Sequence, residues 1–299
     1  MNKMFKKIFG WECSSFDIYQ QSYYKFGGSV NTHPKILQYL LDKKICEIDF
    51  YHYKKKDIIQ GCFFEISNKV GVNLWRTYPI TSDEIILPVN IDKKVFLPGR
   101  SNKISSAHSN HFYNTIFTKF RPKKKFICLA KDDFSKKSHK NRRNEFNKFI
   151  KEGGVVKNVN ELQPEQLANI YVLLFKKRFQ DNVKCYSKEI LIDFFTYFKD
   201  MIFGYVLFID GSLPCAYDFI LKAESDKWIY FDVPNGGVDP DYSHLSVGSI
   251  LMWLNINEAD KLCNDKNKKR LFSIGLYDPK WDYKTRWCNK VPVGKTIFM

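Results

Sequence analysis

The chain has 299 residues, of which 44% are hydrophobic and 16% aromatic, and its formal net charge is +16. This hydrophobic content excludes a disordered chain, and the length predicts about two domains, each with a buried core. The positive charge favours an anionic partner: nucleic acid, an acidic membrane surface or a polyphosphate ligand. No window approaches the roughly 18 consecutive apolar residues that a membrane-spanning helix needs.

The eight cysteines are scattered along the chain without CxxC spacing. This pattern indicates neither a zinc site nor a thioredoxin-like motif, and we expect no metal. Several cysteines lie in apolar runs, where cysteine behaves as a small core residue. We therefore expect free thiols in a reducing compartment, which indicates a cytoplasmic protein. The N-terminal segment lacks the apolar stretch and cleavage site of a secretory signal.

Residues 3–11 predict a short cationic helix with two interpretations. Its apolar and basic positions fall on different sides: Met4, Phe5, Ile8 and Phe9 against Lys3, Lys6 and Lys7. Such a helix can lie in a membrane interface with its lysines towards anionic headgroups. It can equally be a terminal helix that packs on its own domain.

The first third of the chain predicts helices followed by strands. Residues 16–24 form a helix that ends at Gly27 and Gly28, and Pro34 opens the next helix. The glycine pair also resembles a phosphate-binding loop, but a helix C-cap explains it more simply. Four extended runs follow, and the first three form an antiparallel meander: 46–53, 58–66, 70–76 and 83–88. This order indicates a mixed α/β layer.

A strongly basic segment follows at residues 119–151, with thirteen Lys or Arg and three acidic residues. Ser135 or Ser138 can start a helix over 135–152 that ends at a glycine pair. The first half of this helix carries five cations where the helix dipole favours anions: Lys136, Lys137, Lys140, Arg142 and Arg143. The segment is a solvated linker helix, a surface for the phosphate groups of a ligand, nucleic acid or anionic lipid, or a DNA reader.

Residues 203–287 are the most informative stretch. Asp210-Gly211 between two apolar runs predicts a hairpin, and Pro234 is expected to end the next strand, 228–233. Ser246 is positioned to cap a helix with apolar residues three and four apart. A strand followed by this helix leaves free backbone amides at Ser246, Val247, Gly248 and Ser249, which can bind an anion.

Two levels of resemblance follow from these segments. A strand near 155, helices at 168–179 and 187–201 and the 203–287 block resemble the acyl-coenzyme A N-acyltransferase (GNAT) fold. KKSHKNRRNEF, DGSLPCAYDFIL, HLSVGSILMW and YDPKWDYKTRW resemble its peptidoglycan aminoacyl-transferase branch, whose members pair two GNAT-like halves. FGGSVNTHP, FYHYKKK and WIYFDVPNGG are similar to the bacterial macrophage-inducible Mig family of antimicrobial-peptide-resistance proteins.

The resemblance implies a mixed α/β fold with two GNAT-like halves, 1–122 and 123–299, and a role in resistance to cationic antimicrobial peptides. It implies acyl-coenzyme A or aminoacyl-tRNA as the donor, bound at the Ser246–Ser249 turn. That turn departs from the usual Arg/Gln-x-x-Gly-x-Gly/Ala loop. The implied transfer needs a base and an acid, for which the candidates are Asp232 or His244 and Tyr283. Lys284 and Arg286 are candidates for phosphate contacts.

Three functions stay open from the sequence. The first is acyl or aminoacyl transfer to an amine. The second is a non-enzymatic resistance factor, bound through its basic helix to the cytoplasmic face of the inner membrane. The third is a transcription regulator. Against this third function, the sequence has no helix-turn-helix, zinc-finger or basic-zipper spacing.

Overall fold

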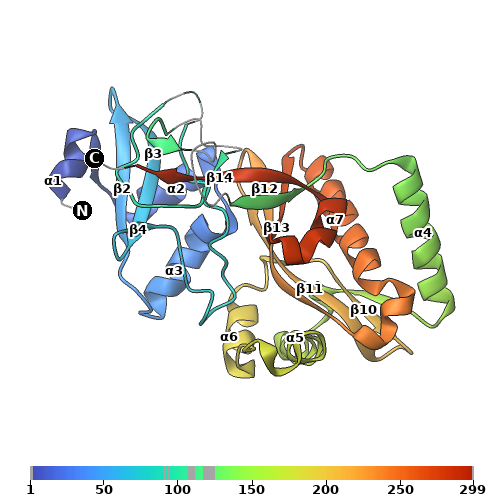
Figure 1. The fold of residues 1–299 in the computed structure, drawn as a ribbon. Helices are drawn as coiled ribbons and strands as arrows, with labels where there is room; N and C mark the ends of the chain where they lie inside the picture. The colour runs from blue at the N-terminus through green and yellow to red at the C-terminus, as the bar shows by residue number, and fades with distance from the viewer. Residues whose placement is uncertain (1–2, 91, 93, 107–111, 117–124, 298–299) are drawn as a thin grey trace.

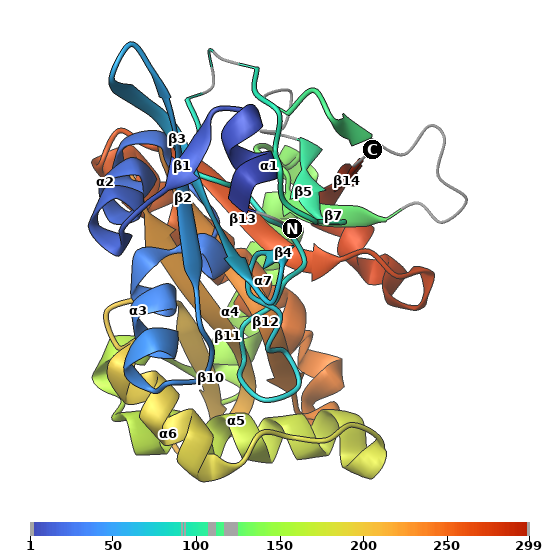
Figure 2. The ribbon, with the colours of Figure 1, turned by 90° about the vertical axis from the view of Figure 1, so that its left-hand side faces the viewer.

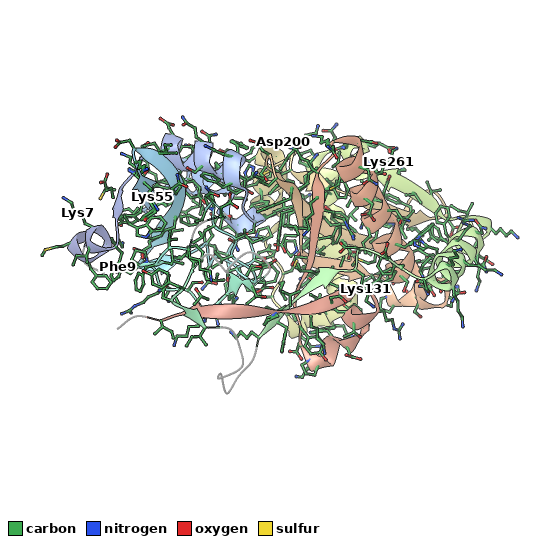
Figure 3. The ribbon with its side chains drawn as sticks, turned by 90° about the horizontal axis from the view of Figure 1, so that it is seen from above. Lys7, Phe9, Lys55, Lys131, Asp200 and Lys261 are labelled. Atoms are coloured by element: carbon green, nitrogen blue, oxygen red, sulfur yellow. The ribbon has the colours of Figure 1, made fainter. Side chains whose placement is uncertain are left out.

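The computed structural model describes residues 3–90, 92, 94–106, 112–116 and 125–297. Within these residues the chain forms a four-stranded sheet near the N-terminus and a ten-stranded sheet built mainly from later residues. In Figure 1 the small sheet lies at the same end as α1 (Lys3–Ile8), and α4 (Lys136–Lys151) lies at the opposite end. Seen from above, the molecule is elongated (Figure 3).

The N-terminal sheet is an antiparallel meander covered by helices α2 (Phe16–Phe26) and α3 (Pro34–Asp42). Its strands follow chain order: β1 (Trp11–Cys13), β2 (Asp49–Lys55), β3 (Ile58–Ile66) and β4 (Lys69–Val70). The prediction of a strand over 70–76 is wrong, because Gly71 adopts a positive φ of 89° and turns the chain out of the ladder. The helix C-cap prediction is confirmed, since the Gly27 amide donates to the Tyr23 carbonyl.

Helix α1 packs on its own domain. The Lys6 ammonium is buried, forms an ion pair with Glu65 and lies 3.8 Å from the centre of the Tyr51 ring. The Phe9 ring stacks on Phe96 with 3.9 Å between ring centres. The expectation that Lys6 faces anionic headgroups is therefore wrong, because its charge is satisfied inside the protein.

The large sheet has the order β5-β14-β7-β13-β12-β11-β10-β8, with β6 beside β14 and β9 beside β11. All its neighbouring strands run antiparallel except β12 and β13, which are parallel. The strands are β5 (Ile104–Ser105), β6 (Thr115–Ile116), β7 (Phe126–Ala130), β8 (Val155–Asn158), β9 (Ile202–Phe203), β10 (Tyr205–Ile209), β11 (Leu213–Glu224), β12 (Trp228–Val238), β13 (Lys269–Leu276) and β14 (Cys288–Thr296). The predicted hairpin at Asp210-Gly211 is confirmed between β10 and β11.

Helices cover both faces of this sheet. Helices α5 (Pro164–Phe179) and α6 (Lys188–Tyr197) lie together below the strands in Figures 1 and 2. On the other face lies α7 (Val247–Asp265), and α4 packs on its outer side through Phe146 and Trp253. The alternation of side chains along β11 explains both layers, since Phe219 joins the α5–α6 core and Ile220 joins the α7 core.

Strand β12 continues past Pro234, so the prediction that the strand ends there is wrong. The register of β11 and β12 shifts between Phe219 and Leu221, and such a bulge tolerates a proline inside a sheet. Pairing of β12 with the parallel strand β13 ends at Asp232 and Ser273. Beyond this point β12 remains paired only with β11, and the sheet opens beside the start of α7.

The two predicted halves share one continuous core. Aromatic and aliphatic side chains of α2, α3 and β3 belong to the same buried cluster as those of α5, α6 and β11. The Trp228 indole donates a 2.9 Å hydrogen bond to the Gly28 carbonyl. Strand β14 pairs with β7 and also with β5 and β6. The predicted boundary at residues 122 and 123 lies outside the described residues and stays a prediction.

The basic segment forms its helix as expected, with the Ser135 hydroxyl accepting from the Ser138 amide. The helix ends at Lys151, and Gly153 follows with a positive φ of 84°. All eight cysteines have free thiols. Across the described part of the chain, no helix is both long enough and apolar enough to cross a bilayer.

Candidate functional site

Helix α7 begins without a side-chain cap. Ser246 occupies the N-cap position in the left-handed conformation, with φ 56°, and its hydroxyl accepts no capping hydrogen bond. The prediction that Ser246 caps this helix is therefore wrong. The Ser246 carbonyl accepts from the Ser249 amide, at 2.9 Å. The amides of Val247 and Gly248 find no acceptor among the described residues. Two backbone donors at the positive end of the helix dipole are thus available to an anion.

A cavity of about 430 Å³ lies beside this junction, where β12 has separated from β13; we call it the α7 cavity. All four residues of the predicted anion-binding turn, 246–249, line it. Three polar side chains face them across the cavity, and they come from three different elements: Arg178, Asp218 and Tyr283. The structure therefore brings the predicted turn together with Tyr283 and with two residues that were not predicted site residues, Arg178 and Asp218.

Asp218 is the only carboxylate among the described residues that line the α7 cavity. It lies in β11 opposite Gly236 of β12, and 9% of its surface is exposed. Burial raises the pKa of Asp218 to about 6, and the nearby Arg178 charge offsets part of that rise. A Cβ atom on Gly236 would lie 2.1 Å from the Asp218 Oδ1. Glycine at this position therefore leaves the space that the carboxylate occupies.

Arg178 connects three walls of the cavity. It lies in the last turn of α5 and donates to the Gly236 carbonyl at 2.7 Å. Its other terminal nitrogen donates to the Tyr283 hydroxyl at 3.3 Å. The guanidinium also lies 5.5 Å from the centre of the Trp281 ring. These contacts orient the Tyr283 hydroxyl towards the α7 cavity and leave its proton available for donation.

A second cavity of about 300 Å³ adjoins the first; we call it the α4 cavity. Both cavities have Ser249 and Trp287 in their lining. Three cations line the α4 cavity: Lys137, Arg142 and Arg286. An ion pair of 2.6 Å with Glu145 compensates part of the Arg142 charge. The combined surface offers backbone donors at one end and cations at the other, which suits an extended phosphate-containing ligand.

The remaining predicted cations lie outside both cavities. Lys136, Lys140 and Arg143 are exposed on α4 and line neither cavity. The Lys284 ammonium donates to the carbonyls of Ile274 and Leu276, at 2.7 and 3.0 Å. These two hydrogen bonds hold the ammonium against the backbone, away from both cavities. Only part of the predicted cationic surface is therefore concentrated at the cavities.

Asp232 and His244 do not join this site. Asp232 is buried at the contact between the two halves, where the Thr81 hydroxyl donates to it at 2.6 Å. Burial raises the pKa of Asp232 to about 7, and the nearby acids Asp83 and Glu84 add to the rise. His244 is exposed and lines neither cavity. Their predicted roles as bases therefore stay predictions without support from the cavity geometry.

One signal in the sequence could have identified Asp218. It is the single charge in the apolar run CAYDFIL, and a carboxylate inside a buried strand is costly unless it has a role. No comparable signal marks Arg178, because cations are common in the last turn of a helix.

Comparison with known proteins decides the family. The family model described as Mig-14 matches residues 33–296. The chain belongs to the Mig-14 family. No curated protein sequence matches this Mig-14 family member.

Solved structures show the fold of this Mig-14 family protein. FemX aligns with a TM-score of 0.57 and 8% identity, covering 96% of this chain and 97% of FemX. A conserved protein of unknown function from Bacteroides thetaiotaomicron aligns with a TM-score of 0.53 and 11% identity, covering 96% and 99%. The prediction of a mixed α/β fold with two GNAT-like halves is confirmed.

L-PGS from Bacillus licheniformis is more distant, with a TM-score of 0.43 and 11% identity. That match covers 64% of this chain and 65% of L-PGS, so the chain spans less than two thirds of that protein. A likeness at this level carries no functional argument.

Proposed function

We propose that this Mig-14 family protein transfers an acyl or aminoacyl group from a phosphate-containing donor to an amine, and that this transfer supports resistance to cationic antimicrobial peptides. The observation that carries the proposal is the shared cavity of Asp218 and the α7 amides. A carboxylate whose pKa is raised to about 6 faces two backbone donors without acceptors across one cavity. Such a pair can accept a proton and hold an anion in the same step.

The proposed step is nucleophilic attack by the acceptor amine on the donor carbonyl. A C–N bond forms, the proton of the amine passes to the Asp218 carboxylate, and the thioester or ester bond of the donor breaks. The Tyr283 hydroxyl, held by Arg178 at 3.3 Å, protonates the leaving sulfur or oxygen. Tyr283 then regains a proton from solvent while Asp218 loses one, which restores both groups for the next cycle. The amides of Val247 and Gly248 hold the donor phosphate during this step.

Two donor classes fit this surface and differ in how much of α4 they would contact. The phosphates of an acyl-coenzyme A would reach from the α7 amides to Lys137 and Arg142 in the α4 cavity. An aminoacyl-tRNA is larger, and its backbone would extend over exposed cations farther along α4, such as Lys140 and Arg143. Reversing these two exposed charges, in Lys140→Glu with Arg143→Glu, is therefore expected to weaken tRNA binding only.

The test measures donor binding by isothermal titration calorimetry with acetyl-coenzyme A and by filter binding with aminoacyl-tRNA. Gly248→Asp places a negative charge beside the α7 amides and is expected to weaken whichever donor binds. Asn264→Asp adds the same charge at the other end of α7, where Asn264 is exposed, and serves as the matched control. The proposal fails if neither donor binds the wild-type protein, or if both variants bind equally well.

A second candidate function has support from one observation. Exposed cations on α4, including Lys136, Lys140 and Arg143, could bind an anionic membrane without any catalysis. Complementation of a deletion strain separates the two functions, because Asp218→Asn removes the proposed base and leaves α4 intact. Loss of peptide resistance in cells that still contain the variant supports transfer. Full resistance supports the non-enzymatic membrane factor.

A further inference from the structure

Two carboxylates are buried where the two halves of the chain meet. Asp232, in β12, is 4% exposed, and Glu84, in the N-terminal half, is 3% exposed. The Thr81 hydroxyl donates to Asp232 at 2.6 Å, and the Tyr230 hydroxyl donates to Glu84 at 2.5 Å. We call these four residues the seam cluster. Each of the two hydrogen bonds joins one half of the chain to the other through a carboxylate.

The backbone is fixed on both sides of the seam cluster. The Asn31 side-chain amide donates to the carbonyls of Thr81 and Glu84, at 3.1 and 3.0 Å, which attaches these residues to the N-terminal half. On the other side, Asp232 lies opposite Ser273 in the last residue pair of β12 and β13. The hydrogen bond from Thr81 therefore ends at the point where β12 and β13 separate.

Little positive charge compensates the two carboxylates. Among the described residues, neither Asp232 nor Glu84 forms an ion pair. Two cations lie on neighbouring segments, and both are near Asp83. The Lys103 ammonium lies 3.3 Å from the Asp83 carboxylate, and the Lys284 ammonium donates to two backbone carbonyls. The carboxylates of the seam cluster therefore depend on hydroxyl donors.

Ionisation of Asp232 is costly in this environment. Burial raises the pKa of Asp232 to about 7, and the charges of Asp83 and Glu84 add to the rise. Burial also raises the pKa of Glu84. Asp232 therefore binds a proton in mildly acidic solution and loses it as the pH rises through about 7. The lost proton leaves an uncompensated negative charge at the contact between the halves, which favours hydration of the carboxylate.

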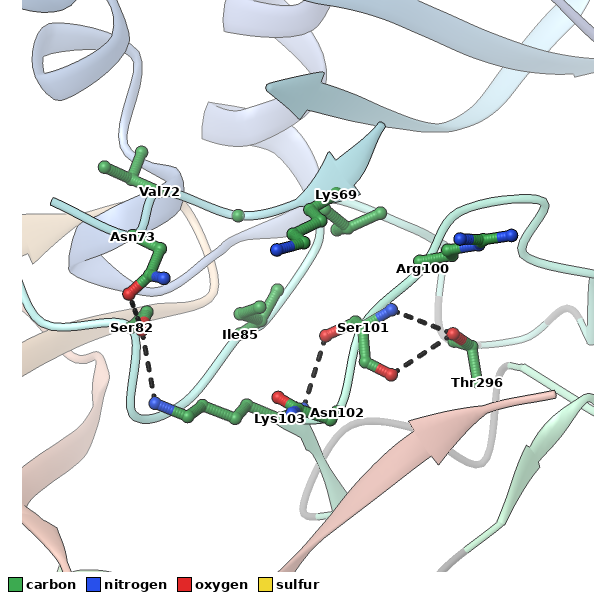
Figure 4. Close-up of a pocket in the computed structure, with 12 residues that line it drawn as sticks. Lys69, Val72, Asn73, Ser82, Ile85, Arg100, Ser101, Asn102, Lys103 and Thr296 are labelled. Atoms are coloured by element: carbon green, nitrogen blue, oxygen red, sulfur yellow. Dashed lines mark hydrogen bonds between the residues drawn. The ribbon is translucent and has the colours of Figure 1, made fainter. Parts of the chain in front are cut away.

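Water has space beside the seam cluster. A cavity of about 220 Å³ lies there, with Thr81, Asp83 and Pro234 in its lining. Ser82 and Lys103 line this cavity and also the larger one, of about 310 Å³, in Figure 4. In that view the Lys103 ammonium donates to the Ser82 hydroxyl, at 3.2 Å. Polar groups and adjoining space of this size suit the entry of water when the charge appears.

We propose that the seam cluster is a pH-dependent switch at the contact between the two halves. While Asp232 is protonated, the contact stays closed. Once Asp232 is ionised, water enters beside Thr81, and the end of β12 moves more freely against the N-terminal half. Because β12 and β13 separate at Asp232, this motion also changes the width of the α7 cavity. The switch does not depend on the proposed transfer and can be measured without a donor.

The direction of the pH effect follows from the two states of Asp232. In the open state water hydrates the carboxylate, so its pKa returns towards 3.8, whereas in the closed state its pKa is about 7. The closed state therefore binds more protons between about pH 4 and 7. Opening should increase by up to about tenfold per pH unit over this range and become constant above about pH 7.

Hydrogen–deuterium exchange of the full-length protein, corrected for the pH dependence of the chemical exchange rate, measures this opening. From pH 5 to 7, amides in residues 81–86 and 228–233 should lose up to about a hundredfold in protection, with little further change to pH 8.5. They should exchange faster than amides in the centre of β11 at every pH, because the contact opens without global unfolding.

Three variants test the assignment. Asp232→Asn keeps the shape of the protonated side chain, so protection of both segments should be independent of pH. Glu84→Gln removes a neighbouring negative charge, which lowers the pKa of Asp232, so opening should become constant at a lower pH. Asp57→Asn is the matched control: it removes one charge from the exposed turn between β2 and β3, where φ is 59°, and should behave as the wild type.

Four outcomes would overturn the switch. The first is protection that does not change with pH in the wild type, and the second is an unchanged pH dependence in Asp232→Asn. The third is exchange of both segments at the same rate as the centre of β11, because this would show global unfolding alone. The fourth is loss of the pH dependence in Asp57→Asn as well, because net charge would then be the cause.

Discussion

Replacing Asp218 by asparagine should stabilise the protein at neutral pH while removing its proposed activity. A tenfold change in proton affinity corresponds to about 1.4 kcal/mol. A rise of the Asp218 pKa from 3.8 to about 6 therefore corresponds to a cost of up to about 3 kcal/mol for the ionised folded state. Asparagine has a similar shape and carries no charge, so it avoids this cost. A stabilising substitution that abolishes function is typical of a residue retained for its chemistry.

The dependence on pH makes this prediction specific. Between about pH 4 and 6 the folded state binds more protons at Asp218 than the unfolded state does, because the pKa is raised on folding. Wild-type stability should therefore fall as the pH rises through this range and become constant above about pH 7. Asp218→Asn lacks this contribution, so its advantage over the wild type should grow by up to about 3 kcal/mol from pH 4 to 7.

Urea unfolding of both proteins at a series of pH values measures this difference. Asp232→Asn serves as a comparison, because burial also raises the pKa of Asp232, to about 7, but Asp232 lies outside the α7 cavity. The stability advantage of each variant over the wild type should grow with rising pH, but only Asp218→Asn should lose transfer activity. A constant stability difference between Asp218→Asn and the wild type from pH 4 to 8 would refute the conclusion that burial raises the pKa of Asp218. Loss of activity in Asp232→Asn but not in Asp218→Asn would identify Asp232 as the base.

Three further predictions concern the fold. Lys6→Ala should destabilise the protein by about 3–5 kcal/mol in urea unfolding, because it leaves the buried Glu65 carboxylate unpaired; a change near zero would contradict burial of the pair. Gly237→Ala should lower the melting temperature, because its Cβ would lie 2.5 Å from the Leu174 Cβ; unchanged calorimetric melting would contradict the close contact of α5 with β12. In the native protein a thiol reagent should modify Cys13 first, since it is the only exposed cysteine of the eight, and Cys13→Ser should remove this fast reaction.

Local sequence signals predicted the regular elements well and the irregular ones poorly. The helix that follows Ser135 and the hairpin at Asp210-Gly211 depend on neighbouring residues only, and both form as expected. Pro234 carries a true strand-breaking signal, but it lies in a bulge of β12, where two residues stand opposite one residue of β11, and the bulge accommodates it. A bulge depends on contacts between distant segments, which no local pattern records.

The choice between two acidic residues shows the same limit at the candidate site. Asp218 and Asp232 each lie within an apolar run, and only Asp232 was predicted as a base. Which of them faces a cavity depends on where β12 separates from β13 and on the register of β11 against β12. The α7 amides could be predicted because a strand followed by a helix creates them locally. Their partner carboxylate could not.

Strand β14 has a consequence for biosynthesis. It pairs with β7 and also supplies the edge on which β5 and β6 lie, so Thr296 contacts Ser101 across 195 positions of sequence. Contacts at such separation form slowly, because a long loop must close first. During translation the early segments at β5 and β6 must wait for a partner that follows them by many residues, 195 positions in the case of Ser101 and Thr296. Until β14 leaves the ribosome, these segments remain open to chaperones, proteases and wrong neighbours.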